Sequence, residues 1–130
     1  MSFDLIVFDI KSATRNRSDF DGWVETRLKW EEAHGYNDPS VTTSSLKSWF
    51  DEMRKSFPPM NGPLAVDDED EEFIADYNIG KDMIYVTFGW SAALIAYNEA
   101  LRISVKHNVG FFNISDDQDG PIFHITGSIV

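Results

Sequence analysis

The stretch FIADYNIGKDMIYVTF, Phe73–Phe88, decides the fold, because it contains two runs of strand-forming residues separated by a short connection. The runs Phe73–Ile79 and Met83–Phe88 are rich in β-branched and aromatic residues, and Gly80 between them is typical of a hairpin. The sequence therefore predicts a β-hairpin in the second half of the chain.

Three further segments predict strands. Phe3–Phe8 contains a continuous apolar run that is too short for a helix, which indicates a buried strand. Phe111–Ile114 and Ile122–Thr126 are short runs of strand formers, joined by the polar turn Ser115–Gly120. We expect these segments to share a sheet with the hairpin.

Helical spacing of apolar residues predicts three helices. They extend from Ser18 or Asp19 to about His34, from a cap at Thr43 or Ser44 to Pro58 and Pro59, and from a cap at Ser91 to about Asn108. The apolar residues that indicate the third helix are Leu94, Ile95, Ala96, Leu101, Ile103 and Val105.

The predicted order is strand, helix, helix, strand, strand, helix, strand, strand. This order favours an α+β architecture with an antiparallel or mixed sheet of about five strands and three helices packed mainly on one face. With 130 residues, of which 42% are hydrophobic, the chain is expected to form a single domain, residues 1–130.

Composition excludes several classes of function. The chain has no cysteine, so disulfides and thiolate metal sites are not available. Its net charge of -11 repels nucleic-acid phosphates and anionic lipid surfaces. No apolar run reaches the length needed to cross a bilayer and no signal peptide is recognisable, so we expect a cytoplasmic protein.

Two acidic clusters are candidate recognition sites for a basic partner. The first is the run Asp67, Asp68, Glu69, Asp70, Glu71 and Glu72, for which a solvated loop and a divalent-cation site are the alternatives. The second is Asp116, Asp117 and Asp119, in a turn that resembles the start of an EF-hand loop. Ser115 and Thr126 occupy its first and last ligand positions, so a polar hairpin turn is the better interpretation.

No recognisable catalytic or metal-binding motif is present, and we expect neither an enzyme nor a cofactor. The three histidines are not spaced as zinc ligands, and no serine lies in a nucleophile motif. Asp4 and Asp9 could form a carboxylate pair at the ends of the first strand. The rival hypothesis is an enzyme or small-molecule binder with a pocket beside the sheet, to which His124, Asp4 or Asp76 contributes.

Two aromatic residues are candidate interface anchors. Trp90 lies where a predicted strand meets the third helix, and Tyr36 lies in a predicted loop. Aromatic side chains are enriched at binding hot spots, although a core position is the alternative for Trp90.

Four segments carry a family resemblance: MSFDLIVFD at the N-terminus, SFPPMNGP at Ser56–Pro63, ADYNIGKDMIYVTFGWS at Ala75–Ser91 and VGFFNIS at Val109–Ser115. Together they resemble a family of small acidic bacterial proteins that includes immunity proteins of contact-dependent or polymorphic toxin systems. The resemblance implies a cytoplasmic immunity protein that binds and blocks a secreted toxin domain, expected to be a basic nuclease.

Overall fold

The structure is a computed structural model that describes residues 2–10, 22, 25, 39–59, 73–113, 122–124 and 127–129. Its strands are β1 (Ser2–Phe8), β2 (Ala75–Ile79), β3 (Met83–Gly89), β4 (Gly110–Phe112), β5 (Ile122–His124) and β6 (Gly127–Ile129). Its helices are the α-helices α2 (Ser44–Ser56) and α3 (Ala93–His107) and the 3-10 turns η1 (Pro39–Val41) and η3 (Trp90–Ala92).

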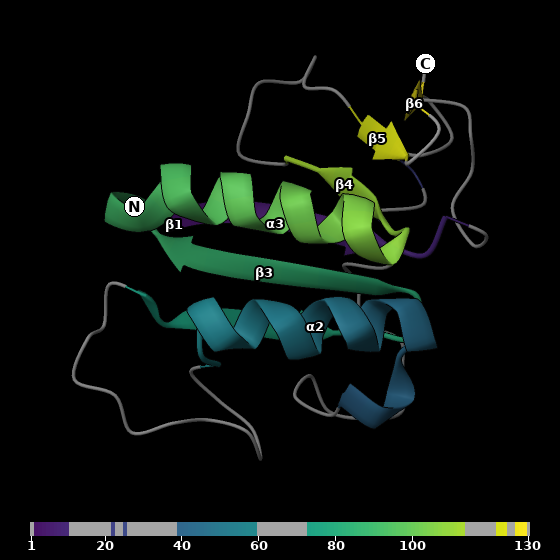
Figure 1. Cartoon of the computed structure of the whole chain (residues 1–130), viewed down its shortest axis with the longest axis horizontal. Helices are drawn as coiled ribbons and strands as arrows, with labels where there is room; N and C mark the ends of the chain where they lie inside the picture. The colour runs from purple at the N-terminus through teal and green to yellow at the C-terminus, as the bar shows by residue number, and fades with distance from the viewer. Residues whose placement is uncertain are drawn as a thin grey trace.

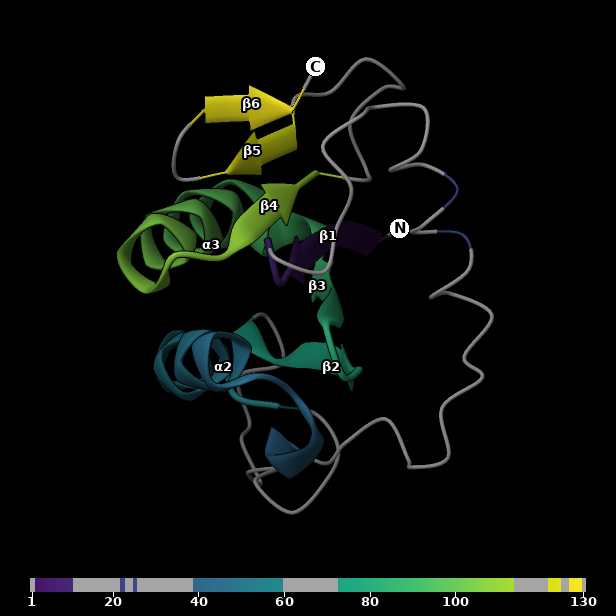
Figure 2. The same cartoon turned by 90° about the vertical axis from the view of Figure 1, so that its right-hand side faces the viewer.

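The strands form one sheet in the order β2-β3-β1-β4-β5-β6, and every pair of neighbours is antiparallel. Strands β2, β3, β1 and β4 form the body of the sheet, which the short β5 and β6 extend beyond β4. Helices α2 and α3 lie side by side on the same face of the sheet (Figure 2). They run in opposite directions, as the colours in Figure 1 show.

β1 is the central strand, because it pairs with β3 along its whole length and with β4 over its second half. Leu5 and Val7 point to the helix face, while Ile6 and Phe8 alternate to the opposite face. All four side chains are fully buried. This explains the unbroken apolar run in the sequence, since a strand buried on both faces does not alternate between apolar and polar residues.

Of the two predicted caps, Thr43 is the one that begins α2: its hydroxyl oxygen accepts a hydrogen bond from the backbone N–H of Leu46. The backbone N–H of Thr43 also donates to the carbonyl of Lys81 in the β2–β3 turn. At the other end of α2, the hydroxyl of Tyr77 in β2 donates to the carbonyl of Phe57 at 2.7 Å. The helix is therefore fixed to the hairpin at both of its ends.

The start of α3 differs from the prediction. Ser91 does not cap the helix; it lies inside η3, and the N-cap residue is Ala92, which makes no side-chain capping bond. The end of α3 is set by Asn108, whose φ of 68° places it in the left-handed region. This residue turns the chain directly into β4.

The hydrophobic core fills the space between the helices and the sheet. α2 contributes Leu46, Trp49, Phe50 and Met53, whereas α3 contributes mainly small residues, Ala96 and Ala100, together with Ile103. The sheet contributes Leu5, Val7, Tyr77, Ile79, Ile84, Val86, Phe88 and Phe111. Phe57 packs edge-on against Phe88, with ring centroids 5.0 Å apart.

The structure confirms the α+β class and an antiparallel sheet with the described helices on one face. The predicted count of five strands and three helices is not confirmed. Most of the first predicted helix lies outside the described residues, which include only Gly22 and Glu25 of it, both helical. Strand β6 was not predicted. The last residues of the final two predicted strands, Ile114 and Thr126, lie outside the described residues. Neither α2 nor α3 has the length and hydropathy of a transmembrane helix.

Gly110 is required by its neighbour in the sheet. It pairs with Phe8, and a Cβ atom at this position would lie only 2.1 Å from Cε2 of the Phe8 ring. The Phe8 side chain is fully buried, so the ring cannot move away without disturbing the packing around it.

We predict that Gly110→Ala destabilises the protein, because the new methyl group overlaps a buried ring; overpacking of this kind costs about 1–3 kcal/mol. Urea denaturation followed by circular dichroism measures the change. The matched control is Gly22→Ala, because a Cβ at this helical glycine meets nothing within 4 Å. An equally stable Gly110→Ala variant would contradict the steric role of Gly110.

Candidate protein-binding surface

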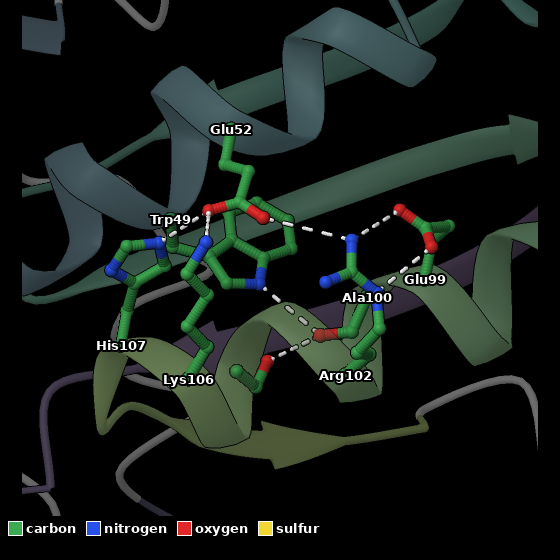
Figure 3. Close-up of polar contacts among 8 residues, drawn as sticks. Trp49, Glu52, Glu99, Ala100, Arg102, Lys106 and His107 are labelled. Atoms are coloured by element: carbon green, nitrogen blue, oxygen red, sulfur yellow. Dashed lines mark hydrogen bonds and ion pairs between the residues drawn. The ribbon is translucent and has the colours of Figure 1, made fainter.

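The position of α3 is fixed by polar contacts with α2. The indole N–H of the fully buried Trp49 donates to the carbonyl oxygen of Ala100 at 3.3 Å, across the interface between the two helices (Figure 3). The same carbonyl accepts a hydrogen bond of 2.6 Å from the hydroxyl of Ser104, one turn further along α3. The Trp49 bond links α3 to α2, whereas the Ser104 bond lies within α3.

Glu52 of α2 is the centre of an ion-pair network with α3 (Figure 3). Its Oε1 lies 2.9 Å from Nζ of Lys106 and 2.9 Å from Nε2 of His107, and its Oε2 lies 3.6 Å from Nη2 of Arg102. Arg102 in turn forms two hydrogen bonds of 3.0 Å with the carboxylate of Glu99. Hydrogen bonds from Lys106 and His107 lower the pKa of Glu52 to about 2.

The two helices carry more positive than negative charge, unlike the chain as a whole. Their cations are Lys47, Arg54, Lys55, Arg102 and Lys106, and their anions are Asp51, Glu52 and Glu99. The whole chain has 11 Lys and Arg against 22 Asp and Glu. The excess of acidic residues therefore belongs to the parts of the sequence other than α2 and α3.

Exposed apolar side chains are concentrated on one element. Among the described residues, the large hydrophobic side chains that are exposed are Trp90, Leu94, Ile95 and Val105, with exposed fractions of 53%, 74%, 51% and 62%. All four belong to η3 and α3. Single exposed apolar residues are ordinary, whereas a contiguous apolar patch is typical of an interaction site.

Three of these residues form what we call the Trp90 surface: Trp90, Leu94 and Ile95, where the chain passes from β3 into α3. The Trp90 ring packs edge-on against Phe3 of β1, with centroids 6.0 Å apart and an interplanar angle of 70°. One side of the indole is therefore supported by the sheet while about half of the residue faces solvent. A large aromatic side chain held in this way loses little further conformational freedom on binding, which is favourable for an interface anchor.

The structure describes only part of the predicted partner-binding set. Trp90 is exposed rather than in the core, and its role as an anchor stays a prediction. The acidic run from Asp67 to Glu72, the acidic turn with Asp116, Asp117 and Asp119, and Tyr36 lie outside the described residues. Their contribution to binding stays a prediction.

Sequence interpretation missed the exposure of Leu94, Ile95 and Val105, which it grouped with the core residues of the third helix. A helical wheel contains the correct signal, because these residues do not share a face with Ala96, Ala100 and Ile103. The large apolar residues were assigned to the core, but the face of α3 that packs on the sheet consists mainly of small residues.

The residues of the rival pocket hypothesis do not converge. Asp4 in β1 and Asp76 in β2 are both opposite Thr87 of β3, on its two sides. His124 lies in β5, two strands away from β1, and the strand pairing places it level with Phe8. Phe8 and Asp4 are four residues apart in β1, which is roughly 13 Å at about 3.3 Å per residue. Asp9 has left the strand, and its N–H donates to the carbonyl of Asp82. Asp4 lies four residues before the end of β1, roughly 13 Å along the strand at about 3.3 Å per residue, and Asp9 follows that end, so the two are too far apart for a carboxylate pair.

Asp4 instead accepts a hydrogen bond from the hydroxyl of Tyr85, with 2.5 Å between the two oxygens. Burial, and then this hydrogen bond, raise the pKa of Tyr85. Across the described residues, no group of three or more His, Cys, Asp or Glu side chains could hold a metal ion.

No protein-family model matches this chain, nor does any curated protein or solved structure.

We predict that Glu52 makes the stability of the fold depend on acidic pH. Its folded-state pKa of about 2 is below the ordinary value of 4.5, so its ion pairs stabilise the protein above that ordinary value. This stabilisation is lost as the pH falls from about 4.5 towards about 2, because the carboxylate is then protonated.

Urea denaturation in a buffer series across this window tests the prediction. Glu52→Gln should be less stable than the wild type at neutral pH and should show a shallower loss of stability on acidification. Glu25→Gln, at an exposed position, is the control. Equal losses in the wild type and Glu52→Gln would show that the network does not stabilise the fold.

Proposed function

We propose that this chain is an immunity protein, which binds a cognate secreted bacterial toxin domain and blocks its activity. The observation that carries the proposal is the Trp90 surface, where three large apolar side chains are exposed and one of them is an aromatic ring supported from behind by Phe3. A surface of this kind is suited to binding a protein, and blocking an enzyme needs surface rather than a reacting group.

The family resemblance supports the same function from the sequence. The acidic clusters add a reason to expect a basic toxin, such as a nuclease, because carboxylates can occupy the positions that substrate phosphates take in its active site. In this proposal the Trp90 surface supplies affinity, whereas the acidic clusters supply fast association and selectivity.

We predict that Trp90→Ala weakens binding to the toxin domain strongly. Truncating a hot-spot aromatic costs about 2 kcal/mol or more, which corresponds to roughly a 30-fold rise in Kd. Isothermal titration calorimetry against the product of the adjacent gene measures this. Ile95→Ala should act in the same direction, with a smaller effect.

Val105→Ala is the matched control, because Val105 is also apolar and exposed on α3 but lies at its far end. Unchanged melting temperatures would show that all three variants are folded. If the Trp90→Ala variant binds as tightly as the wild type, or if Val105→Ala weakens binding as much as Trp90→Ala does, the Trp90 surface is not the binding site. A neighbouring protein that does not bind the wild type at all would contradict the proposed function.

We also predict that the acidic clusters control the rate of association. Replacing Asp67–Glu72 with asparagine and glutamine should slow association and flatten its dependence on salt, with a smaller effect on dissociation. The Debye length is about 8 Å in 0.15 M salt, so only charges near the interface have a strong effect. Stopped-flow kinetics across a salt series measures the association rate of this variant and of a second variant with the same change at Asp116, Asp117 and Asp119. The comparison shows which cluster controls association. If neither variant changes the rate, the acidic clusters do not contribute to association.

A further inference from the structure

The two halves of α3 are held in place to different degrees. Among the described residues, the polar contacts that join α3 to α2 involve Ala100, Arg102, Lys106 and His107, all from the middle of the helix onward. The C-terminal end is also closed, because the backbone N–H of Asn108 donates to the carbonyl of Ser104. The basic residues of the last turn complement the helix dipole there.

The first turn of α3, Ala93–Ala96, lacks the features that stabilise the start of a helix, and we call it the entry turn. Its N-cap residue Ala92 makes no side-chain capping bond, and no acidic residue lies in the turn. A missing cap lowers the equilibrium constant for forming a helix end by about fivefold. Leu94 and Ile95 are exposed, so packing of the turn depends on two alanines, whose methyl groups lose little apolar burial when the turn opens.

The segments on both sides of the entry turn are attached to the sheet. Ala92 in η3 is fully buried, and the Trp90 ring packs edge-on against Phe3 of β1. After the turn, Tyr97 packs edge-on against Phe111 of β4, with ring centroids 5.4 Å apart. The entry turn is therefore a weakly held helical turn between two attached segments.

We propose that the entry turn opens and closes locally in the folded protein while Trp90 stays packed on Phe3. Local opening occurs where few apolar side chains are buried, and its free energy is then much smaller than that of global unfolding. Leu94 and Ile95 lie on the turn that opens, whereas Trp90 precedes it. The Trp90 surface therefore combines one fixed aromatic ring with two apolar side chains that change position.

Local opening also determines how the Trp90 surface accepts a partner, a step that rests on the proposed function. A toxin domain seated on Trp90, Leu94 and Ile95 binds the closed turn only. Its apparent affinity is reduced by the fraction of molecules in which the turn is open. Binding in turn stabilises the closed form, so the amides of this region exchange more slowly in the complex.

Amide hydrogen exchange, followed by NMR on the purified full chain, tests the proposal without any partner. The reporters are the N–H groups of residues 97–100, because in an α-helix they bond to the carbonyls of the entry turn, four residues earlier. After correction for intrinsic rates, they should exchange at least about tenfold faster than the N–H groups of residues 103–106. Their rates should also depend little on low concentrations of urea, because local opening exposes little surface.

Leu94→Glu tests the cause of the opening. It places a negative charge at the second position of α3, where the charge interacts favourably with the helix dipole. Exchange of the reporters should become about two- to fivefold slower than in Leu94→Gln, which has the same shape without the charge. Val105→Glu is the matched control, because it adds the same charge near the other end of α3 and should not slow the reporters.

Two results would overturn the proposal. Equal exchange rates and equal urea dependence in the two halves of α3 would show that the helix opens only with the whole protein. Reporters that are no slower in Leu94→Glu than in Leu94→Gln would show that the uncapped start is not the cause. Both measurements use the free protein, so either failure leaves binding of a toxin domain to be judged by calorimetry, and a failure to bind leaves the exchange result intact.

Discussion

The central position of β1 is the constraint on which the rest of the structure depends. Hydrogen bonds join it to β3 on one side and β4 on the other, and its side chains are buried on both faces. Leu5 and Val7 face α2 and α3, and Phe8 covers Gly110 of the neighbouring strand. A shift of β1 by one residue would exchange its two faces and place Phe8 in the core between the sheet and the helices. The pairing register of β1 is therefore strongly specified.

Sequence patterns predicted the elements whose signals are local. The hairpin, the capping of α2 by Thr43 and the buried β1 each depend on a few adjacent residues, and the structure contains all three. Ser91 was misjudged as a cap because a serine before an apolar run is also compatible with a 3-10 turn, which the structure forms there. The strand order could not be predicted, because it depends on contacts between segments that are far apart in the chain.

Of the exposed apolar residues of the candidate surface, only Trp90 was among the predicted partner-binding residues. The reason is that α3 uses small residues against the sheet, which lets the helix approach closely and leaves larger apolar residues for the outside. A rule that assigns large apolar residues to the core therefore predicts the wrong buried face for α3. The contact between Trp49 and Ala100 shows why the approach is close: an indole N–H reaches the backbone of α3, which a larger residue at position 100 would obstruct.

The distribution of charge and of apolar surface divides the protein into two parts with different physical roles. The helix layer has a small positive balance and carries the exposed apolar side chains, which can supply affinity over short distances. The strong negative charge belongs to the rest of the chain and acts over longer distances, limited by screening. Short-range apolar contact and long-range charge are therefore properties of different residues in this chain.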